Sequence, residues 1–186
     1  MTVVEADILS VPEAAANGPQ RCYHCKTALF SQLWAAVRDD GYTVLLDGTN
    51  ASDNAGDRPG MRALRELEVR SPLRECGLTK EEVRRRSREA GLFTWNKPAY
   101  ACLATRIPTG TPITKEDLDR VERAECALET LGFRDFRVRL FHGAARLQMT
   151  EEQLPLALEK QAELRAALRP DFSDVLLDLA PRTPST

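Results

Sequence analysis

Two cysteines lie three residues apart near the start of the chain, in the stretch RCYHCK, where basic residues flank Cys22 and Cys25. Apolar side chains recur at helical spacing over residues 22–37, which predicts a helix. Positions i and i+3 share one face of a helix, so both sulfurs can point at a single centre. Such a pair is typical of a metal or cluster site or of a redox pair, but cysteines also pack as small apolar residues.

A third cysteine, Cys102, lies in the segment NKPAYACLATRIPTG together with Lys97, Thr105 and Arg106. Cationic neighbours favour the thiolate, which is the form that attacks carbon centres and binds metals. Three cysteines suit a four-iron four-sulfur cluster with one open iron. A structural zinc ion takes four ligands, and Cys76 could be the fourth. The cysteines alone therefore leave both metals open.

Two arginines alternate with apolar residues in the segment DFRVRLF. On a strand, Arg137 and Arg139 project from one face and form a fork that fits phosphate or carboxylate groups, although such arginines often face only solvent. Asp47 follows an apolar stretch, residues 42–46, which we predict to be a strand. Ligands of open α/β sheets bind at such strand ends. The run EEVRRRSREA is predicted to be the exposed surface of a helix.

The elements that must position these residues alternate between helices and strands. A capping box formed by Thr79 and Glu82 predicts one helix start, and Thr114 with Asp117 predicts another. We also expect Thr150 to cap a helix. The expected strands are residues 2–9, 42–46, 135–141, 144–149 and 174–180. This alternation predicts an α/β fold.

Composition excludes several classes of protein. The 186 residues have a formal net charge of −2, and no apolar run approaches the ~18 residues that a membrane span needs. The N-terminus lacks the basic and apolar regions of a secretion signal, so we expect a cytoplasmic protein. A net negative charge also argues against a large nucleic-acid-binding surface.

The motifs described above resemble the LarE type of ATP-dependent sacrificial sulfur transferase. The likeness runs in order through RCYHCK, LLDGTNASDNAGDRPGMRALRE, the long segment from VRSPLREC to RIPTG, and LGFRDFRVRLFHG. It implies a PP-loop ATP pyrophosphatase domain, Rossmann-like with a parallel sheet, followed by a small α/β domain. On this basis we assign residues 1–110 to the C-terminal part of the first domain. Residues 111–186 then form a small domain for substrate binding and sulfur transfer.

The resemblance also implies an activity in the biosynthesis of the nickel-pincer nucleotide cofactor. AMP is placed on a carboxylate of a pyridinium biscarboxylic acid mononucleotide, and sulfur then replaces AMP to give a thiocarboxylate. Cys102 matches the sulfur-donating cysteine of the family. In members that also carry the CxxC pair, Cys22, Cys25 and Cys102 hold a four-iron four-sulfur cluster whose open iron carries a spare sulfide.

Other positions take roles from the same resemblance. Thr105, Arg106, Arg137 and Arg139 match residues near the phosphate and carboxylates of the substrate. Asp47 and Asp57 are candidates for contacts to magnesium or nucleotide. The expected partners are this small-molecule substrate and further copies of the chain in a homo-oligomer, without a membrane.

One feature of PP-loop enzymes is not found in the sequence. Their SGGxDS-like loop binds the phosphates of ATP through backbone amides, but no two glycines are adjacent here. We therefore expect ATP and Mg²⁺ to bind only together with an N-terminal PP-loop segment, supplied by a longer gene product or by another chain. Two alternative functions remain: a tRNA-thiolating PP-loop enzyme with an iron–sulfur cluster, and a truncated, non-catalytic metal-binding subunit.

Overall fold

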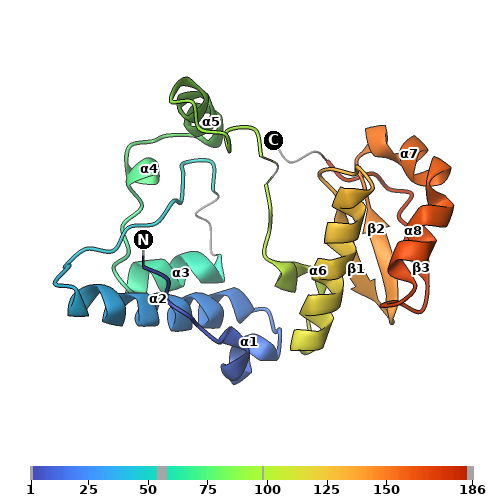
Figure 1. Cartoon of the computed structure of the whole chain (residues 1–186). Coiled ribbons are helices and arrows are strands. Elements are labelled where there is room, and N and C mark those ends of the chain that lie inside the picture. The colour runs from blue at the N-terminus through green and yellow to red at the C-terminus, as the bar shows by residue number, and fades with distance from the viewer. Residues whose placement is uncertain (1, 54–57, 98, 184–186) are drawn as a thin grey trace. The chain divides into compact units, whose positions relative to one another are not determined.

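The computed structural model describes residues 2–53, 58–97 and 99–183, in two compact units (Figure 1). The first unit is Met1–Lys97 and the second is Pro98–Thr186. Our sequence-based boundary after residue 110 lies further along the chain. The segment that carries Cys102 is therefore part of the second unit. None of the helices in the described ranges is long and apolar enough to cross a membrane.

The first unit is helical. Its elements are a 3₁₀ turn, η1 (Ile8–Ser10), and the helices α1 (Pro12–Ala15), α2 (Arg21–Asp39), α3 (Pro59–Glu66), α4 (Pro72–Glu75) and α5 (Lys80–Glu89). The helix predicted over residues 22–37 is confirmed as α2. The capping box of Thr79 and Glu82 is also confirmed, because each side chain accepts a hydrogen bond from the other residue's backbone amide at the start of α5.

Helix α3 packs against α2 and fixes its orientation within the first unit. The indole Nε1 of Trp34 donates a hydrogen bond of 2.7 Å to the carbonyl of Leu67, and Ala63 and Leu64 are buried. Gly60 lies close to the turn of α2 that bears Cys22. A Cβ atom at Gly60 would be 3.7 Å from the Cβ of Cys22. That distance is an ordinary van der Waals contact, so α3 lies directly against the turn of α2 that bears Cys22.

Two strands predicted in the first unit are not formed. The described residues 2–7 have no regular structure, and residues 8–10 form η1. In the stretch 42–46, only an isolated parallel bridge between Leu46 and Arg70 is present, and Tyr42, Val44 and Leu46 are exposed. Apolar and β-branched residues favour extended backbone, but a strand needs a neighbouring strand to bond with.

The second unit combines helices with a three-stranded sheet. Its elements are η2 (Leu103–Arg106), α6 (Lys115–Thr130), β1 (Arg137–Phe141), β2 (Ala144–Gln148), η3 (Glu151–Gln153), α7 (Leu154–Glu159), α8 (Gln161–Leu168) and β3 (Val175–Leu177). The sheet order is β1-β2-β3, antiparallel between the first two strands and parallel between the last two. The three predicted strands of this unit are confirmed. Thr150 precedes the short turn η3 and makes no side-chain cap.

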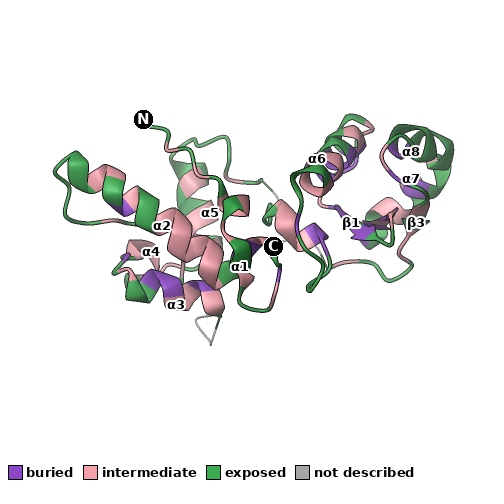
Figure 2. Ribbon diagram, turned by 90° about the horizontal axis from the view of Figure 1, so that it is seen from below, coloured by how far each residue is buried: buried purple, intermediate pink, exposed green. Residues whose placement is uncertain are grey.

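Helices α6 and α8 bury one face of this sheet. Figure 2 shows buried residues on α6 and β1. Val121 and Leu128 of α6 and Val138 of β1 are buried. The opposite face carries Arg137 and Arg139, which alternate with Val138 along β1. The chain as a whole therefore mixes helices and strands, as an α/β prediction requires. In its described residues, the only sheet is that of the second unit.

Candidate active site

Cys102 lies at the start of the turn η2, and its side chain is exposed. Its carbonyl oxygen accepts two hydrogen bonds from Thr105, one from the backbone amide at 2.9 Å and one from the hydroxyl at 2.8 Å. These bonds fix the backbone of Cys102 while the thiol remains accessible. This is the arrangement that a reacting thiol needs.

Three arginines hold the segment that carries Cys102. Each donates a hydrogen bond to a main-chain carbonyl of residues 99–106. The bonds run from Arg137 to Ala99 (2.5 Å), from Arg106 to Ala101 (3.3 Å) and from Arg139 to Thr105 (2.7 Å). The structure thus brings together Cys102 and the four residues that the sequence predicts to bind substrate. It also gives these arginines contacts within the protein that the sequence did not predict.

Arg106 is fully buried and forms a two-pronged ion pair with Glu125 of α6. The two bonds, from Nε to Oε1 and from Nη2 to Oε2, measure 2.7 and 2.9 Å. Glu125 Oε1 also accepts the backbone amide of Val138 at 3.0 Å. One carboxylate therefore connects η2, α6 and β1. Arg106, which is 1% exposed, therefore has a structural role beneath the protein surface.

Glu125 was not among the residues predicted from the sequence, although a signal for it exists. It lies four residues after Val121 and three before Leu128, in the apolar stripe of α6. A carboxylate in such a stripe is buried when the helix packs, and a buried charge needs a partner of opposite sign. The sequence could therefore have indicated a buried ion pair, but not which arginine forms it.

The positive charges of neighbouring arginines act on both arginines of the strand. Burial lowers the pKa of Arg137, and the charges of Arg106 and Arg182 lower it further. Burial also lowers the pKa of Arg139, with further contributions from Arg106 and Arg146. Because these shifts reflect destabilised positive charge, a bound anion would be stabilised here. Arg139 is exposed and can reach such an anion, whereas Arg137 is 9% exposed.

A cavity of about 660 Å³ adjoins Arg139 in the second unit. It is lined from η2, from α6 and from the turn between β1 and β2. Four arginines contribute to its wall: Arg106, Arg120, Arg139 and Arg146. Asp117 is the one carboxylate in the lining, and it pairs with Arg120 at 2.6 Å. The Nε atom of Arg120 is buried and has no hydrogen-bond acceptor among the described residues.

The contributions of Arg120 and Arg146 were also missed from the sequence. Arg146 lies directly opposite Arg139 in the β1–β2 register, and it pairs with Asp178 at 2.6 Å. Register depends on the turn at residues 142–143, so the pairing of these two arginines is a property of the folded hairpin. The result is a basic cavity large enough for a mononucleotide-sized anion.

The cysteine pair belongs to the first unit, where Cys22 and Cys25 lie in the first turns of α2. Cys22 is exposed and Cys25 is half-buried, and Arg21 Nη2 lies 3.6 Å from the sulfur of Cys22. The five cysteines form no disulfide. Within the part of the chain that the structure describes, no group of three or more His, Cys, Asp or Glu side chains could hold a metal ion. The cluster therefore stays a prediction.

Asp47 has a well-defined environment in the first unit. Its carboxylate accepts hydrogen bonds from the hydroxyls of Ser71 (2.6 Å) and Thr49 (2.5 Å). Burial would raise the pKa of Asp47, but these hydrogen bonds outweigh burial and lower it. The carboxylate is thus held in its charged form. Asp57, the second candidate for magnesium or nucleotide, lies outside the described residues, and both roles remain predictions.

Comparisons with known proteins bear on the family. No family model matches the chain. The chain is 41% identical over 152 residues to an uncharacterised protein of Synechocystis sp., covering 82% of this chain and 57% of that protein. It is 28% identical over 172 residues to an uncharacterised protein of Methanocaldococcus jannaschii, covering 92% of this chain and 68% of that protein.

A third relative has a described function. The chain is 34% identical over 148 residues to the pyridinium-3,5-bisthiocarboxylic acid mononucleotide synthase of Lactiplantibacillus plantarum, covering 80% of this chain and 54% of the synthase. The chain thus spans little more than half the length of this synthase and of the Synechocystis protein. The chain is therefore similar to this synthase over the 148 matched residues, in agreement with the resemblance that its motifs indicate.

Proposed function

We propose that the chain is the sulfur-transferring part of a LarE-type enzyme. Its reaction would convert the AMP-activated carboxylate of a pyridinium-3,5-biscarboxylic acid mononucleotide into a thiocarboxylate, a step in nickel-pincer nucleotide cofactor biosynthesis. The observation that best supports this proposal is the exposed thiol of Cys102. Three arginines form hydrogen bonds to the segment that carries it, and two of them line a basic cavity. The 34% identity to a synthase of the bisthiocarboxylic product supports the same reaction.

The chemistry assigns separate tasks to the thiol and the arginines. A free carboxylate resists nucleophilic attack until adenylation gives it a leaving group. Sulfur then forms a bond to the carboxyl carbon while the carbon–oxygen bond to AMP breaks, and AMP leaves with the electron pair. Arg139 and Arg146 would bind the anionic groups of the substrate in the cavity, because guanidinium forks match phosphate and carboxylate. Holding both reactants in place lowers the barrier by several kcal/mol.

Sulfur for this reaction has two possible sources, and both use Cys102. In the first, Cys102 gives up its own sulfur and becomes dehydroalanine. In the second, a four-iron four-sulfur cluster held by Cys22, Cys25 and Cys102 supplies a replaceable sulfide. Thiolates are the usual ligands of such clusters, and three of them leave one iron open. We favour the second source, because the chain carries the CxxC pair.

Sulfur transfer can be tested apart from adenylation. The anaerobically reconstituted chain would be mixed with the chemically adenylated substrate, and the products analysed by mass spectrometry. We expect a thiocarboxylate, recognised by replacement of one oxygen by sulfur, together with release of AMP. Release of AMP with only the carboxylate as second product would mean simple hydrolysis and would contradict the proposal.

Iron binding gives a second test. Anaerobic reconstitution with iron and sulfide should yield a brown protein with about four irons per chain, because three cysteine thiolates suit a site-differentiated cluster. Replacing Cys22 by serine should reduce the iron content, whereas replacing the exposed Cys126 should not. Elemental analysis measures both. One tightly bound zinc ion per chain that also requires Cys76 would instead support the metal-binding subunit.

Substrate binding should depend on Arg139. We expect Arg139→Ala to weaken binding of the pyridinium mononucleotide by about 1.5–3 kcal/mol, the usual contribution of a charge-assisted hydrogen bond. The matched control is Arg134→Ala, which removes the same charge from an exposed position outside the cavity. Calorimetric titration compares the two. If both variants bound the mononucleotide with equal affinity, Arg139 would be only a solvent-facing residue.

A further inference from the structure

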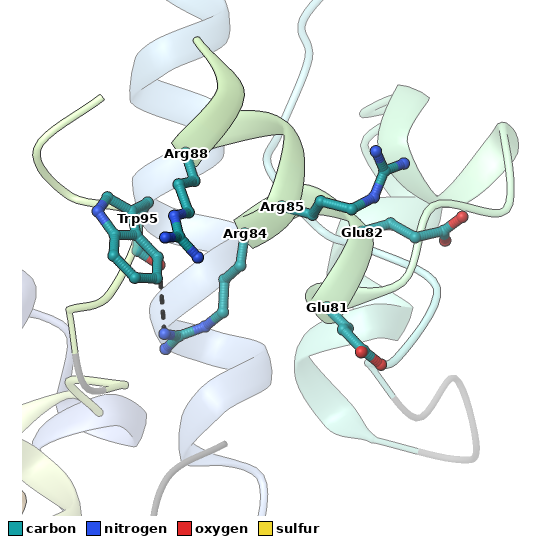
Figure 3. A pocket seen from close by; sticks show the side chains of 6 residues that line it. All are labelled: Glu81, Glu82, Arg84, Arg85, Arg88 and Trp95. Atoms are coloured by element: carbon teal, nitrogen blue, oxygen red, sulfur yellow. Dashed lines mark hydrogen bonds between the residues drawn. The ribbon is translucent and has the colours of Figure 1, made fainter. Parts of the chain in front are cut away.

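A second pocket, of about 440 Å³, lies in the first unit along α5. It is formed by the helix and by the turn that follows it. Figure 3 shows Arg84, Arg88 and Trp95 gathered on one side of the helix, while Arg85 and Glu82 extend in the other direction. The pocket belongs neither to the Cys102 segment nor to the cavity beside Arg139.

The two arginines and the tryptophan hold each other in place. The guanidinium of Arg88 lies over the indole ring of Trp95, 4.9 Å from its centroid. Arg84 donates hydrogen bonds to the carbonyls of Trp95 (3.3 Å) and Lys97 (2.6 Å). These contacts fix the turn against α5. They also limit the motion of both guanidinium groups, so that less conformational entropy is lost when a ligand binds.

Three arginines and two glutamates, Glu81 and Glu82, line this pocket, so its positive charges are only partly balanced. Arg84 and Arg88 are four residues apart and therefore neighbours on the helix surface, and like charges at this spacing destabilise a helix. Among the described residues, neither has a carboxylate within ion-pair distance. By contrast, Arg85 on the same helix pairs with Glu89 at 2.7 Å. An anion between Arg84 and Arg88 would remove this repulsion.

We propose that Arg84, Arg88 and Trp95 form a binding site for a phosphate-class oxyanion. The guanidinium of Arg88 lies over the ring, and guanidinium N–H groups bind phosphate oxygens in pairs. Arg84 uses two of its five N–H donors on carbonyls and has others for the ligand. The volume accommodates a free pyrophosphate or the phosphate of a nucleotide.

Binding of pyrophosphate and of AMP to the full 186-residue chain tests this site. Both ligands would be titrated at low ionic strength by calorimetry and by tryptophan fluorescence. We expect saturable binding and, in Arg88→Gln, a dissociation constant raised by about tenfold, as loss of one charge-assisted hydrogen bond implies. The matched control is Arg86→Gln, at an exposed position of the same helix that does not line the pocket, and its affinity for both ligands should not change.

Comparison of the two ligands also shows whether the site binds a free anion or the phosphate of a nucleotide. Tighter binding of AMP would identify a nucleotide, with its base against the indole, and equal or tighter binding of pyrophosphate would identify a free anion. The cavity beside Arg139 is also basic, so each titration is repeated in the Arg139→Ala background. Equal affinities of Arg88→Gln and Arg86→Gln in that background, or no saturable binding below about 10 mM, would overturn the proposal.

Discussion

Replacing Cys102 by serine is expected to abolish thiocarboxylate formation from the adenylated substrate, with a loss of at least about 10³-fold in rate. Cys102 is needed whether its own sulfur is transferred or whether it binds a cluster, since a hydroxyl can do neither. Because the side chain is exposed, the change should leave the fold intact. Mass spectrometry of the product over a time course measures the effect, and circular dichroism checks the fold.

The matched control is Cys126→Ser, which changes another exposed cysteine of the same unit. It should retain the activity of the unmodified chain. A variant in which Cys22 and Cys25 are both serine separates the two sulfur sources. Loss of all product would favour the cluster, whereas one product per chain and a dehydroalanine at position 102 would favour sacrifice of Cys102. Retained activity in Cys102→Ser would contradict the proposed function.

Replacing Glu125 by alanine is expected to destabilise the second unit by about 3–5 kcal/mol, because it leaves the charge of Arg106 buried without its partner. The backbone amide of Val138 also loses its acceptor. Both tryptophans lie in the first unit, so their fluorescence would not report on the second. Amide hydrogen exchange of α6 and β1 measures the effect directly, and protection should fall by at least about 100-fold.

The control for this prediction is Glu129→Ala, which removes an exposed carboxylate from the same helix. This variant should change the protection of the α6 and β1 amides against hydrogen exchange only slightly. A double variant, Arg106→Met with Glu125→Leu, should recover much of the stability, since replacing a buried ion pair by apolar residues is often neutral. If Glu125→Ala were no more harmful than Glu129→Ala, the buried pair would not support the fold.

Much of the local structure could be predicted from the sequence alone. Helices α2, α5 and α6 follow from apolar periodicity and from capping residues such as Thr79 and Thr114, whose hydrogen bonds are found as expected. The hairpin of β1 and β2 follows from alternating residues around His142 and Gly143. These signals work because each involves residues close together in the sequence, so little depends on the rest of the fold.

The candidate site could be predicted only in part. The sequence singles out Cys102, Arg106, Arg137 and Arg139, and the structure places all four in one unit, where the arginines bond the segment around Cys102. It does not predict that Arg106 is buried. The residue type and the strand period indicate that an arginine can bind anions. Whether that arginine is buried, and which groups it bonds to, depends on the elements that pack against it.

Tertiary structure decided the remaining features, and each depends on residues distant in sequence. Glu125 meets Arg106 only because α6 packs across η2 and β1, and Arg146 faces Arg139 only in the register of the folded hairpin. The stretch 42–46 has the composition of a strand, yet it pairs only through Leu46 with Arg70. Backbone hydrogen bonding between strands requires a neighbour, and no property of five residues specifies where that neighbour lies.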